Sequence, residues 1–463
     1  MRLLPAGLTA AAITLMVSPI RSLPPDSEKA PEFIVTAAPV YKSLAELSGQ
    51  ERFPRGAQLL LVHAGKTEPL VSGFAASADA NVSFDGETVL FAGKKSEGDP
   101  WQLWELTLKD RTVRKVTDTS TDAERPFYLP GGRVVWAQRT AAGFQLQSSD
   151  DGRPAPRFLN PTAGPGILPL TYSGTNAFPT DVLRDGRILF EAGFPLGQGT
   201  TPEMFLVYAD GSGVESVRCD HGRSRWGGTQ LASGDVVFTH GASLARFTSA
   251  MAHEEQVPAP RGEYAGAIAG SASGAWLLSA RADTNARFAI KIWNPGAAKM
   301  GTILAMGGDD LVEPVLVAPR TRPNRHPSGL HPWDYANLLA LDARVSREGD
   351  LRGKPVSVRL AVQDAKGRVV SMGTAPVEND GSFFIKVPVD RPIRFELLDF
   401  KGAVLRQERG WFWARGGEQR ICVGCHAGPE RASENRVPDV LMRTTEPVDL
   451  TGTKAVAAAR GGN

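Results

Sequence analysis

The sequence predicts a mainly β protein, with a β-propeller followed by a small antiparallel β-domain and a short C-terminal segment. A turn that ends in glycine and leads into a β-rich run recurs at Gly86, Gly132, Gly186, Gly234 and Gly274. These glycines lie 46, 54, 48 and 40 residues apart, which is the period of propeller blades. The chain also has 49 Gly and 34 Pro residues, and this abundance favours tight turns and short strands.

The repeat places the propeller at residues 54–318. In each copy the turn precedes an apolar run, such as TVLF at 88–91 and ILF at 188–190, and a weaker copy precedes LLLV at 59–62. Five clear copies and one weak copy predict six blades, with five or seven left open. A large β-sandwich is the alternative architecture, but it does not require a regular period.

Two of the repeats resemble a known family. The runs SFDGETVLFAG and VLRDGRILFEAG are similar to the TolB-like propeller repeats of bacterial exported proteins. The resemblance implies a propeller over a little more than half of the chain. It implies little about chemistry, because this fold serves many functions.

The chain after the propeller falls into four parts. Residues 319–334 are rich in Pro, Arg and His and predict a linker that lies across a surface. Alternating apolar residues and Gly turns at 335–410 predict the small antiparallel β-domain. Residues 411–445 hold a cysteine motif in a context with little β character, and 446–463 form a polar tail that we expect to be flexible.

The first 23 residues have the features of a signal peptide. Arg2 supplies the positive start, and a mostly apolar run follows that is shorter than the roughly 20 residues of a membrane-spanning helix. We therefore expect a periplasmic or otherwise exported protein, with an uncleaved N-terminal anchor as the alternative. No other stretch is apolar enough to span a bilayer.

The overall charge argues against nucleic acid as a partner. Lys and Arg total 52, Asp and Glu total 50, and the net charge is only +2. A protein that binds a phosphate backbone usually shows a basic excess or a basic patch, and this chain shows neither.

The motif that carries chemistry is Cys422-Val423-Gly424-Cys425-His426, which fits the C-x-x-C-H signature for attachment of c-type haem. Two thiols add to the two vinyl groups of the porphyrin, and the adjacent histidine reaches the iron from the proximal side. A thioredoxin-like dithiol would require a βαβ context, and a zinc site would require a second Cys/His pair at short spacing. Neither accompanies the motif, so we expect one covalently attached haem c.

The ligand on the other face of the iron decides between electron transfer and catalysis. His326 and His331 are the preferred candidates because they lie in the linker between the propeller and the haem segment, and Met442 is a further candidate. Cys219 and His221 form a second small group that could hold a soft metal such as zinc. A buried blade cysteine beside a turn histidine is the simpler interpretation of that pair.

Residues 330–440 resemble a second family. The runs VENDGSFFIKVPVDRPIRFELLDFKGAVL and WFWARGGEQRICVGCHAGPE are similar to the haem-bearing middle domain of the hydrazine synthase alpha subunit and its relatives. The resemblance implies that His426 faces a zinc ion, which a propeller cysteine such as Cys219 also binds. In the synthase a tyrosine four residues after the motif histidine binds the iron, and this chain has Glu430 there.

These features favour one function over two others. We expect a haem redox protein that passes electrons to a partner protein or acts on a small molecule, without performing hydrazine synthesis, because the 463 residues contain a single C-x-x-C-H. The alternative is a propeller that binds a ligand or protein and uses haem as a sensor or structural staple. A secreted hydrolase is a weaker third reading, because no G-x-S-x-G motif occurs.

Overall fold

The computed structural model describes residues 31–149, 166–196, 199–346, 349–364, 367–425 and 434–452. The predicted signal peptide and residues 453–463 of the predicted tail lie outside this part. No helix of the described part is long and apolar enough to cross a membrane.

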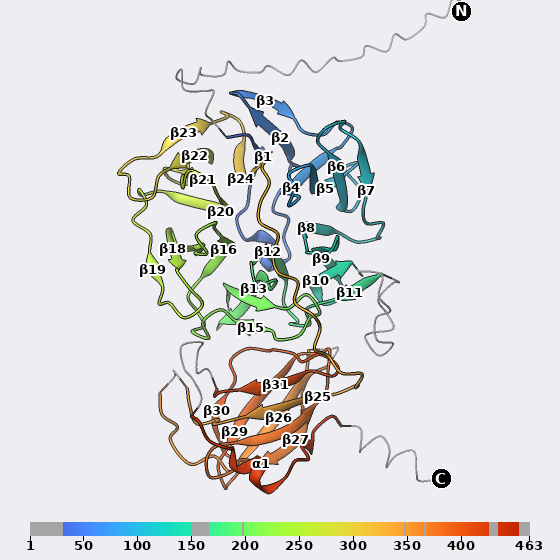
Figure 1. The fold of residues 1–463 in the computed structure, drawn as a ribbon, viewed down its shortest axis with the longest axis vertical. Coiled ribbons are helices and arrows are strands. Elements are labelled where there is room, and N and C mark those ends of the chain that lie inside the picture. The colour runs from blue at the N-terminus through green and yellow to red at the C-terminus, as the bar shows by residue number, and fades with distance from the viewer. Residues whose placement is uncertain are drawn as a thin grey trace, which may run out of the picture.

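Six four-stranded sheets form a ring (Figure 1), which confirms the predicted propeller and its six blades. Blade 1 contains β24 (Asp310–Leu316), β1 (Phe33–Ala38), β2 (Gln58–His63) and β3 (Lys66–Pro69). Blade 2 contains β4 (Ala76–Val82), β5 (Thr88–Lys94), β6 (Gln102–Thr107) and β7 (Val113–Lys115). Blade 3 contains β8 (Ala123–Tyr128), β9 (Val134–Thr140), β10 (Gly143–Ser149) and β11 (Ile167–Pro169).

The other three blades follow the same order from the axis outward. Blade 4 contains β12 (Ala177–Val182), β13 (Ile188–Leu196), β14 (Gly199–Val207) and β15 (Glu215–Ser216). Blade 5 contains β16 (Arg225–Gln230), β17 (Val236–His240), β18 (Ser243–Phe247) and β19 (Glu255–Gln256). Blade 6 contains β20 (Glu263–Gly270), β21 (Trp276–Arg281), β22 (Ala289–Trp293) and β23 (Gly301–Leu304).

Blade 1 closes the ring by joining the two ends of the propeller. β1 lies between β2 and β24 and pairs antiparallel with both, so the first strand of the propeller is hydrogen-bonded to the last. The predicted start at residue 54 was therefore too late, since the ring begins at Phe33. The sequence did not show this strand as part of a repeat because its outer and inner neighbours come from opposite ends of the domain.

The apolar run of the repeat is the second strand of blades 2 to 6, counted from the axis, and in blade 1 the weak copy LLLV lies in the third strand, β2. TVLF at 88–91 lies in β5 and ILF at 188–190 lies in β13, and both runs pack against neighbouring blades on both faces. Val89, Leu90 and Phe91 are each at most 1% exposed. Because the strand is buried on both faces, its residues are apolar without the usual alternation of apolar and polar positions. This strand is therefore the easiest part of these blades to recognise in the sequence.

The C-terminal domain is a sandwich of two four-stranded sheets. One sheet is antiparallel, with β27 (Val369–Pro376), β26 (Ser357–Gln363), β29 (Ile393–Leu398) and β30 (Val404–Gln407). The other is mixed, with β31 (Gln419–Cys422), β25 (Ala336–Ala340), β28 (Phe383–Val387) and β32 (Val448–Asp449). Leu338 and Ile385 of the mixed sheet pack against Leu360 and Phe395 of the antiparallel sheet to form the core.

Two predictions about this domain were wrong in part. The described strand pairs within residues 335–410 are all antiparallel, as predicted, but the motif segment has more β character than expected, because β31 runs parallel to β25 at the edge of the mixed sheet. Residues 446–452 belong to the fold and not to a free tail, since β32 extends the mixed sheet and Leu450 is only 4% exposed in the core. The remaining helix, α1 (Asp439–Arg443), lies against β28.

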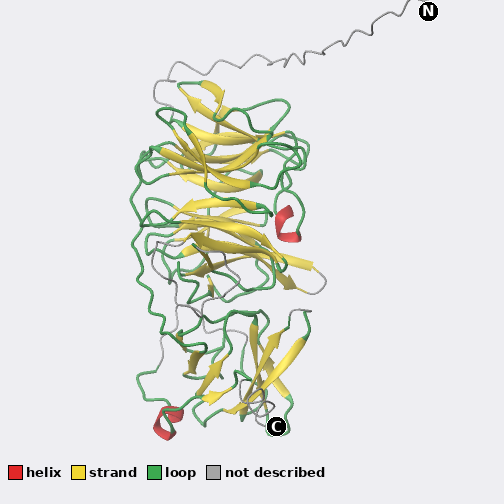
Figure 2. Cartoon of the chain, turned by 90° about the vertical axis from the view of Figure 1, so that its right-hand side faces the viewer, coloured by secondary structure: helices red, strands yellow, loops and turns green. Residues whose placement is uncertain are grey.

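The linker crosses one face of the propeller. It runs from β24 over the middle of the ring to the C-terminal domain, and the 3₁₀ turn η2 (Ala45–Ser48) lies on the opposite face (Figures 1 and 2). Arg320 N–H donates to Phe84 O, and Asn324 N–H donates to Arg184 O, both across the face. At Gly186, with φ +87°, a Cβ atom would lie 2.3 Å from Asn324 O, so only glycine admits the linker there.

Candidate functional site

The cysteine motif begins at the end of an edge strand. Cys422 is the last residue of β31 and lies opposite Ala340 of β25, and its carbonyl oxygen accepts a hydrogen bond from Leu341 N–H. Cys425 follows in the next turn, and both cysteines pack against the sandwich core. Gly424 is required by packing, since a Cβ atom there would lie 2.8 to 3.0 Å from atoms of Val345.

The two motif cysteines line a cavity of about 710 Å³ between blade 4 and the C-terminal domain. We call it the interdomain cavity. Leu338, Phe383, Phe395 and Phe412 form its wall in the C-terminal domain, and Phe190, Phe205 and Phe247 form its wall in the propeller. Cys219 and His221 also line it, so the fold brings these two predicted residues to the motif from about 200 positions away.

The thiols of the motif are held in their neutral form. Burial raises the pKa of Cys422, against the opposing effect of Arg420, and burial together with Glu408 raises the pKa of Cys425 to about 12. All three cysteines are free of disulfides. An apolar wall and raised thiol pKa values disfavour a reactive dithiol, which requires a thiolate stabilised by positive charge.

His221 is fixed in the cavity wall by a buried carboxylate. Its Nδ1 lies 2.6 Å from Glu203 Oε2, and the two side chains are 6% and 7% exposed. Gly222 N–H donates to the other oxygen of Glu203 at 2.5 Å. Cys219 adopts a left-handed backbone with φ +50°, which places it at a sharp turn just before His221. Glu203 lies in β14 and is near His221 only in the folded blade, so no local sequence pattern identifies it.

The linker histidines do not reach the interdomain cavity. His326 stacks on Tyr208 with ring centroids 4.0 Å apart, and His331 stacks on Trp333 at 4.6 Å. Neither residue lines the cavity. Met442 is 76% exposed on α1. Among the described residues, no three His, Cys, Asp or Glu side chains gather closely enough to hold a metal ion.

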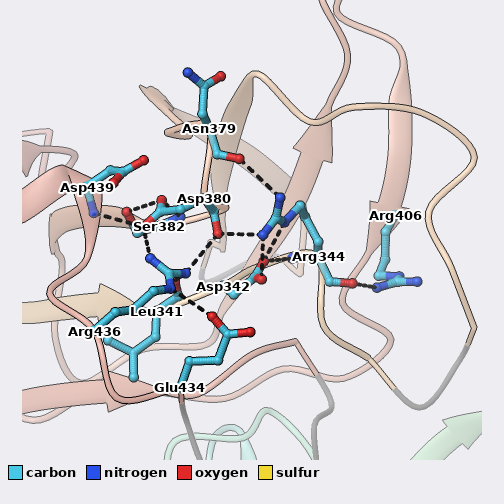
Figure 3. Close-up of polar contacts among 10 residues, drawn as sticks. All are labelled: Leu341, Asp342, Arg344, Asn379, Asp380, Ser382, Arg406, Glu434, Arg436 and Asp439. Carbon is cyan, nitrogen blue, oxygen red and sulfur yellow. Dashed lines mark hydrogen bonds and ion pairs between the residues drawn. The ribbon is translucent and has the colours of Figure 1, made fainter.

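The third member of the motif, His426, lies outside the described residues, as does Glu430. The described part after the motif begins at residue 434 and is held to the domain by the contacts of Arg436 and Asp380 (Figure 3). Arg436 pairs with the Asp380 carboxylate, which also accepts hydrogen bonds from Asp439 N–H at 2.8 Å and from Ser382. Both ends of the segment that contains His426 are therefore anchored, one by β31 and the other by Asp380.

Residues 411–420, which we call the docking segment, bind the propeller directly before the motif. Trp413 Nε1 donates to Gly211 O at 3.1 Å, and Arg415 Nη1 donates to Pro169 O at 2.9 Å. Gly213 N–H donates to Glu418 at 3.1 Å, and Arg420 donates to Val214 O. The acceptors and donors on the propeller are mostly backbone groups of blades 3 and 4.

Arg415 is fully buried within the docking segment. Its side chain is 0% exposed, and its guanidinium group lies over the Tyr172 ring. Arg415 Nη1 is also 3.4 Å from Asp390 Oδ1. Trp413 is 2% exposed and completes a core cluster of blades 3 and 4. The aromatic run WFWAR before the motif is the sequence signal that could have predicted this buried contact.

Comparisons with known proteins agree with the C-terminal assignment. Residues 341–427 match the family model described as the hydrazine synthase alpha subunit middle domain. Hydrazine synthase subunit alpha of Kuenenia stuttgartiensis is 26% identical over 99 residues, which cover 19% of this chain and 12% of that protein. The chain thus carries a segment of the hydrazine synthase alpha type, and the matched sequence spans a small part of the relative.

Solved structures extend the likeness to the fold of both domains. The Kuenenia stuttgartiensis hydrazine synthase structure superposes with a TM-score of 0.76 at 16% identity, covering 92% of this chain and 75% of that chain. TolB from Acinetobacter baumannii superposes with a TM-score of 0.45 at 12% identity, covering 61% of this chain and 66% of that chain. The first likeness shows a shared arrangement of propeller and middle domain.

Proposed function

We propose that this chain is an exported protein that holds one haem c, attached through Cys422 and Cys425, in the interdomain cavity. The position of the two thiols carries the proposal, because both line a single cavity of about 710 Å³. Cofactor pockets range from roughly 300 to 1,000 Å³, so the volume suits a porphyrin. The proposed function is electron transfer to a partner protein, or oxidoreductase chemistry on a small molecule.

The residues that line the cavity fit such a group. Aromatic and aliphatic side chains from both domains line it, and the two thiols pack against apolar atoms at the edge of the space that a porphyrin would fill. A bound haem would supply one-electron chemistry, and its reactivity would depend on how open its iron is. The chain itself supplies the two attachment points, excludes water with the phenylalanines, and holds His221 at the wall through Glu203.

We propose His426 as the proximal ligand of the iron, because it directly follows Cys425 in the attachment motif. The structure places neither His326 nor His331 in the cavity, so we do not propose either as the distal ligand. A distal ligand from the linker would require the linker to leave the propeller face, where Arg320 and Asn324 hydrogen-bond to it.

Expression of the full chain, with its N-terminal segment, in a host that attaches haem c tests the proposal. We expect a denatured protein that still carries haem, with one haem per chain in a pyridine haemochrome assay. We also expect a reduced-minus-oxidised spectrum that disappears in Cys422→Ala/Cys425→Ala. A denatured chain without haem would contradict the proposal.

A second candidate function is a ligand-binding propeller in which the haem serves as a staple or sensor. The observation that favours it is the position of the interdomain cavity, which lies between two domains and would place the group in contact with both. Carbon monoxide and cyanide distinguish the candidates. A spectrum that changes with either ligand favours chemistry at an open iron, whereas an indifferent low-spin spectrum favours electron transfer. A midpoint potential outside the range of exported redox partners favours the staple.

We also propose, from the resemblance, that a zinc ion can bind beside the haem through Cys219, with His221 as a candidate partner. Both residues line the interdomain cavity. Metal analysis of the purified wild type and of Cys219→Ser tests this idea, since zinc should be lost in the variant. Equal zinc contents in the two proteins would end it. The name of the relative does not transfer its reaction, and we propose a reaction other than hydrazine synthesis.

A further inference from the structure

The innermost strands of the propeller share an irregularity at one level of the ring. All six carry a break in register against a neighbouring strand, at Ala78/Asn81, Glu124/Phe127, Pro179/Asp181, Trp226/Thr229, Ala265/Ala269 and opposite Ile34/Thr36. In five of them the extra residue has a left-handed backbone, namely Asp79, Arg125, Gly227, Gly266 and Glu313. Such bulges re-aim side chains and gather at functional sites.

The bulges place a layer of buried charge across the axis of the propeller. Arg52 contacts Asp79, Glu313 and Glu46, and Arg125 contacts Glu46 and Glu191 at the other side of the layer. Four carboxylates therefore share two guanidinium groups, which leaves an excess of negative charge. Glu46, which is 2% exposed, still has an oxygen, Oε2, without a hydrogen-bond partner in the described chain.

A pocket of about 480 Å³ lies above this layer, on the linker side of the ring. We call it the axial pocket. Asp79, Arg125, Glu191 and Glu313 of the charged layer line it, and Phe127, Trp226, Ile268 and Val315 give it apolar walls. The floor of the axial pocket is therefore charged, and its walls are aromatic and aliphatic.

Asp181 is a buried carboxylate of this pocket, and the Arg320 guanidinium at the rim is the cation that acts on it. Asp181 accepts hydrogen bonds from Gln230 N–H at 2.7 Å and Val182 N–H at 2.8 Å, and it forms no ion pair within the described residues. Burial raises its pKa to about 6, and burial also raises the pKa of Glu313 despite Arg52. Thr229 Oγ1, also in the lining, is buried without a partner in the described chain.

The linker forms the roof of the axial pocket. Arg320 donates to Val82 O at 3.3 Å and lies over the Phe84 ring at 4.4 Å, so its guanidinium is held at the rim by groups of blade 2. Pro319 and Thr321 also line the pocket. A ligand in this pocket would touch the segment that joins the propeller to the C-terminal domain.

We propose that the axial pocket binds a small organic amine, with its ammonium group against Asp181 and its apolar body against Trp226 and Phe127. The excess of carboxylates over guanidinium groups selects a cation, and aromatic walls attract a cation further. The volume and the apolar walls suit an organic body better than a bare metal ion. This site is separate from the interdomain cavity, and the proposal does not depend on the haem.

Calorimetric titration of the full purified chain with benzylamine tests the proposal, with benzyl alcohol and benzoate as neutral and anionic analogues. We expect benzylamine to bind and both analogues to bind at least about tenfold more weakly. Asp181→Asn should weaken benzylamine by about tenfold or more. The matched control is Asp118→Asn, which removes an acid that is 89% exposed on blade 2 and should leave binding unchanged.

A second variant covers the case in which Asp181→Asn fails to fold. Ala267→Leu fills the pocket without removing a charge and should abolish benzylamine binding. Equal binding of benzyl alcohol and benzylamine would overturn the proposal, as would binding of calcium chloride in the absence of benzylamine binding. Titrations in which benzylamine gives no heat, or in which both Asp variants behave alike, would also overturn it.

Discussion

The two cavities of this protein are built in opposite ways. The axial pocket lies where six equivalent strands repeat one local feature, a bulge, and its floor is charged. The interdomain cavity lies where the repeat ends and a different domain docks, and its walls are apolar with two neutral thiols. A repeat generates a site by symmetry, whereas docking generates a site from residues that have no common pattern.

The difference determines what each cavity tolerates. Charge at the axis is held by a network in which Arg52 and Arg125 each serve more than one carboxylate, so single changes there leave unpaired buried groups. The interdomain cavity depends instead on a few contacts of the docking segment, above all Trp413 and Arg415. Loss of those contacts should open the cavity while the propeller keeps its fold.

The largest effect is expected from the motif thiols. Cys422→Ala/Cys425→Ala should remove covalent haem completely, because no other thiol lies in the motif, and haem staining after denaturing electrophoresis measures this. Cys219→Ala is the matched control, since this cysteine lines the same cavity from the propeller side and should leave covalent attachment intact. Loss of attachment in the control would show that the propeller wall itself takes part.

The next effect tests the docking segment. Arg415→Met leaves Asp390 without its buried partner and removes the donor to Pro169 O, so we expect a loss of about 3 kcal/mol in chemical denaturation. Arg443→Met, which removes an ion pair whose arginine is 60% exposed, should cost less than about 1 kcal/mol. Hydrogen exchange should rise at the interface and not inside the blades, and a uniform rise would contradict the separation of the two domains.

A smaller loss of stability should distinguish a glycine in an axial bulge from a glycine in an ordinary turn. Gly227→Ala forces a left-handed alanine whose Cβ lies 2.9 Å from Gly266 O, so we expect a loss of about 2 kcal/mol in thermal or chemical unfolding. Gly274→Ala has the same kind of strain at φ +85° but no atom within 4 Å, and it should cost about 1 kcal/mol. Equal losses would mean that the bulge packs no more tightly than a turn.

The smallest effect concerns the clamp on the segment after the motif. Burial acts to raise the pKa of Asp380, but hydrogen bonds from Asp439 N–H, Ser382 and Arg436 outweigh it and lower the pKa to about 2 from 3.8. The carboxylate therefore adds stability that is complete above about pH 4 and is lost as the pH falls toward 2. Asp380→Asn should flatten the dependence of the free energy of unfolding on pH between about 4 and 2, measured by chemical denaturation. Glu434→Gln should leave this dependence unchanged, because the Glu434 side chain is 83% exposed.

Much of the fold could be predicted because each repeat is recognised from residues that are close together in the sequence, a turn glycine followed by an apolar run. The five clear apolar runs of the repeat became the second strand of blades 2 to 6, and the weak copy became the third strand of blade 1, with the turn glycine before each run. The same reasoning could not find β1, whose pairing with β24 joins residues far apart in the chain. It also could not find the parallel partner of β31, because parallel pairs need no adjoining turn.

The candidate site could be predicted only in its chemistry. The spacing of Cys422 and Cys425 is local, so the sequence shows it without a fold, and the haem expected there stays a prediction. Cys219 and His221 were singled out by residue type, and the fold alone brought them to the same cavity. Glu203 escaped notice because its contact with His221 joins β14 to the turn beyond β15.

The sequence by itself determined the blade period, the strand that is buried on both faces, and the cysteine pair, because each depends on neighbours within a few residues. The tertiary structure alone decided which cavity contains the cysteines, which histidines reach it, and where buried charge gathers at the axis. Those outcomes depend on contacts between segments that are hundreds of residues apart. Such contacts are set by the closure of the ring and the docking of Trp413 and Arg415, and no local pattern encodes them.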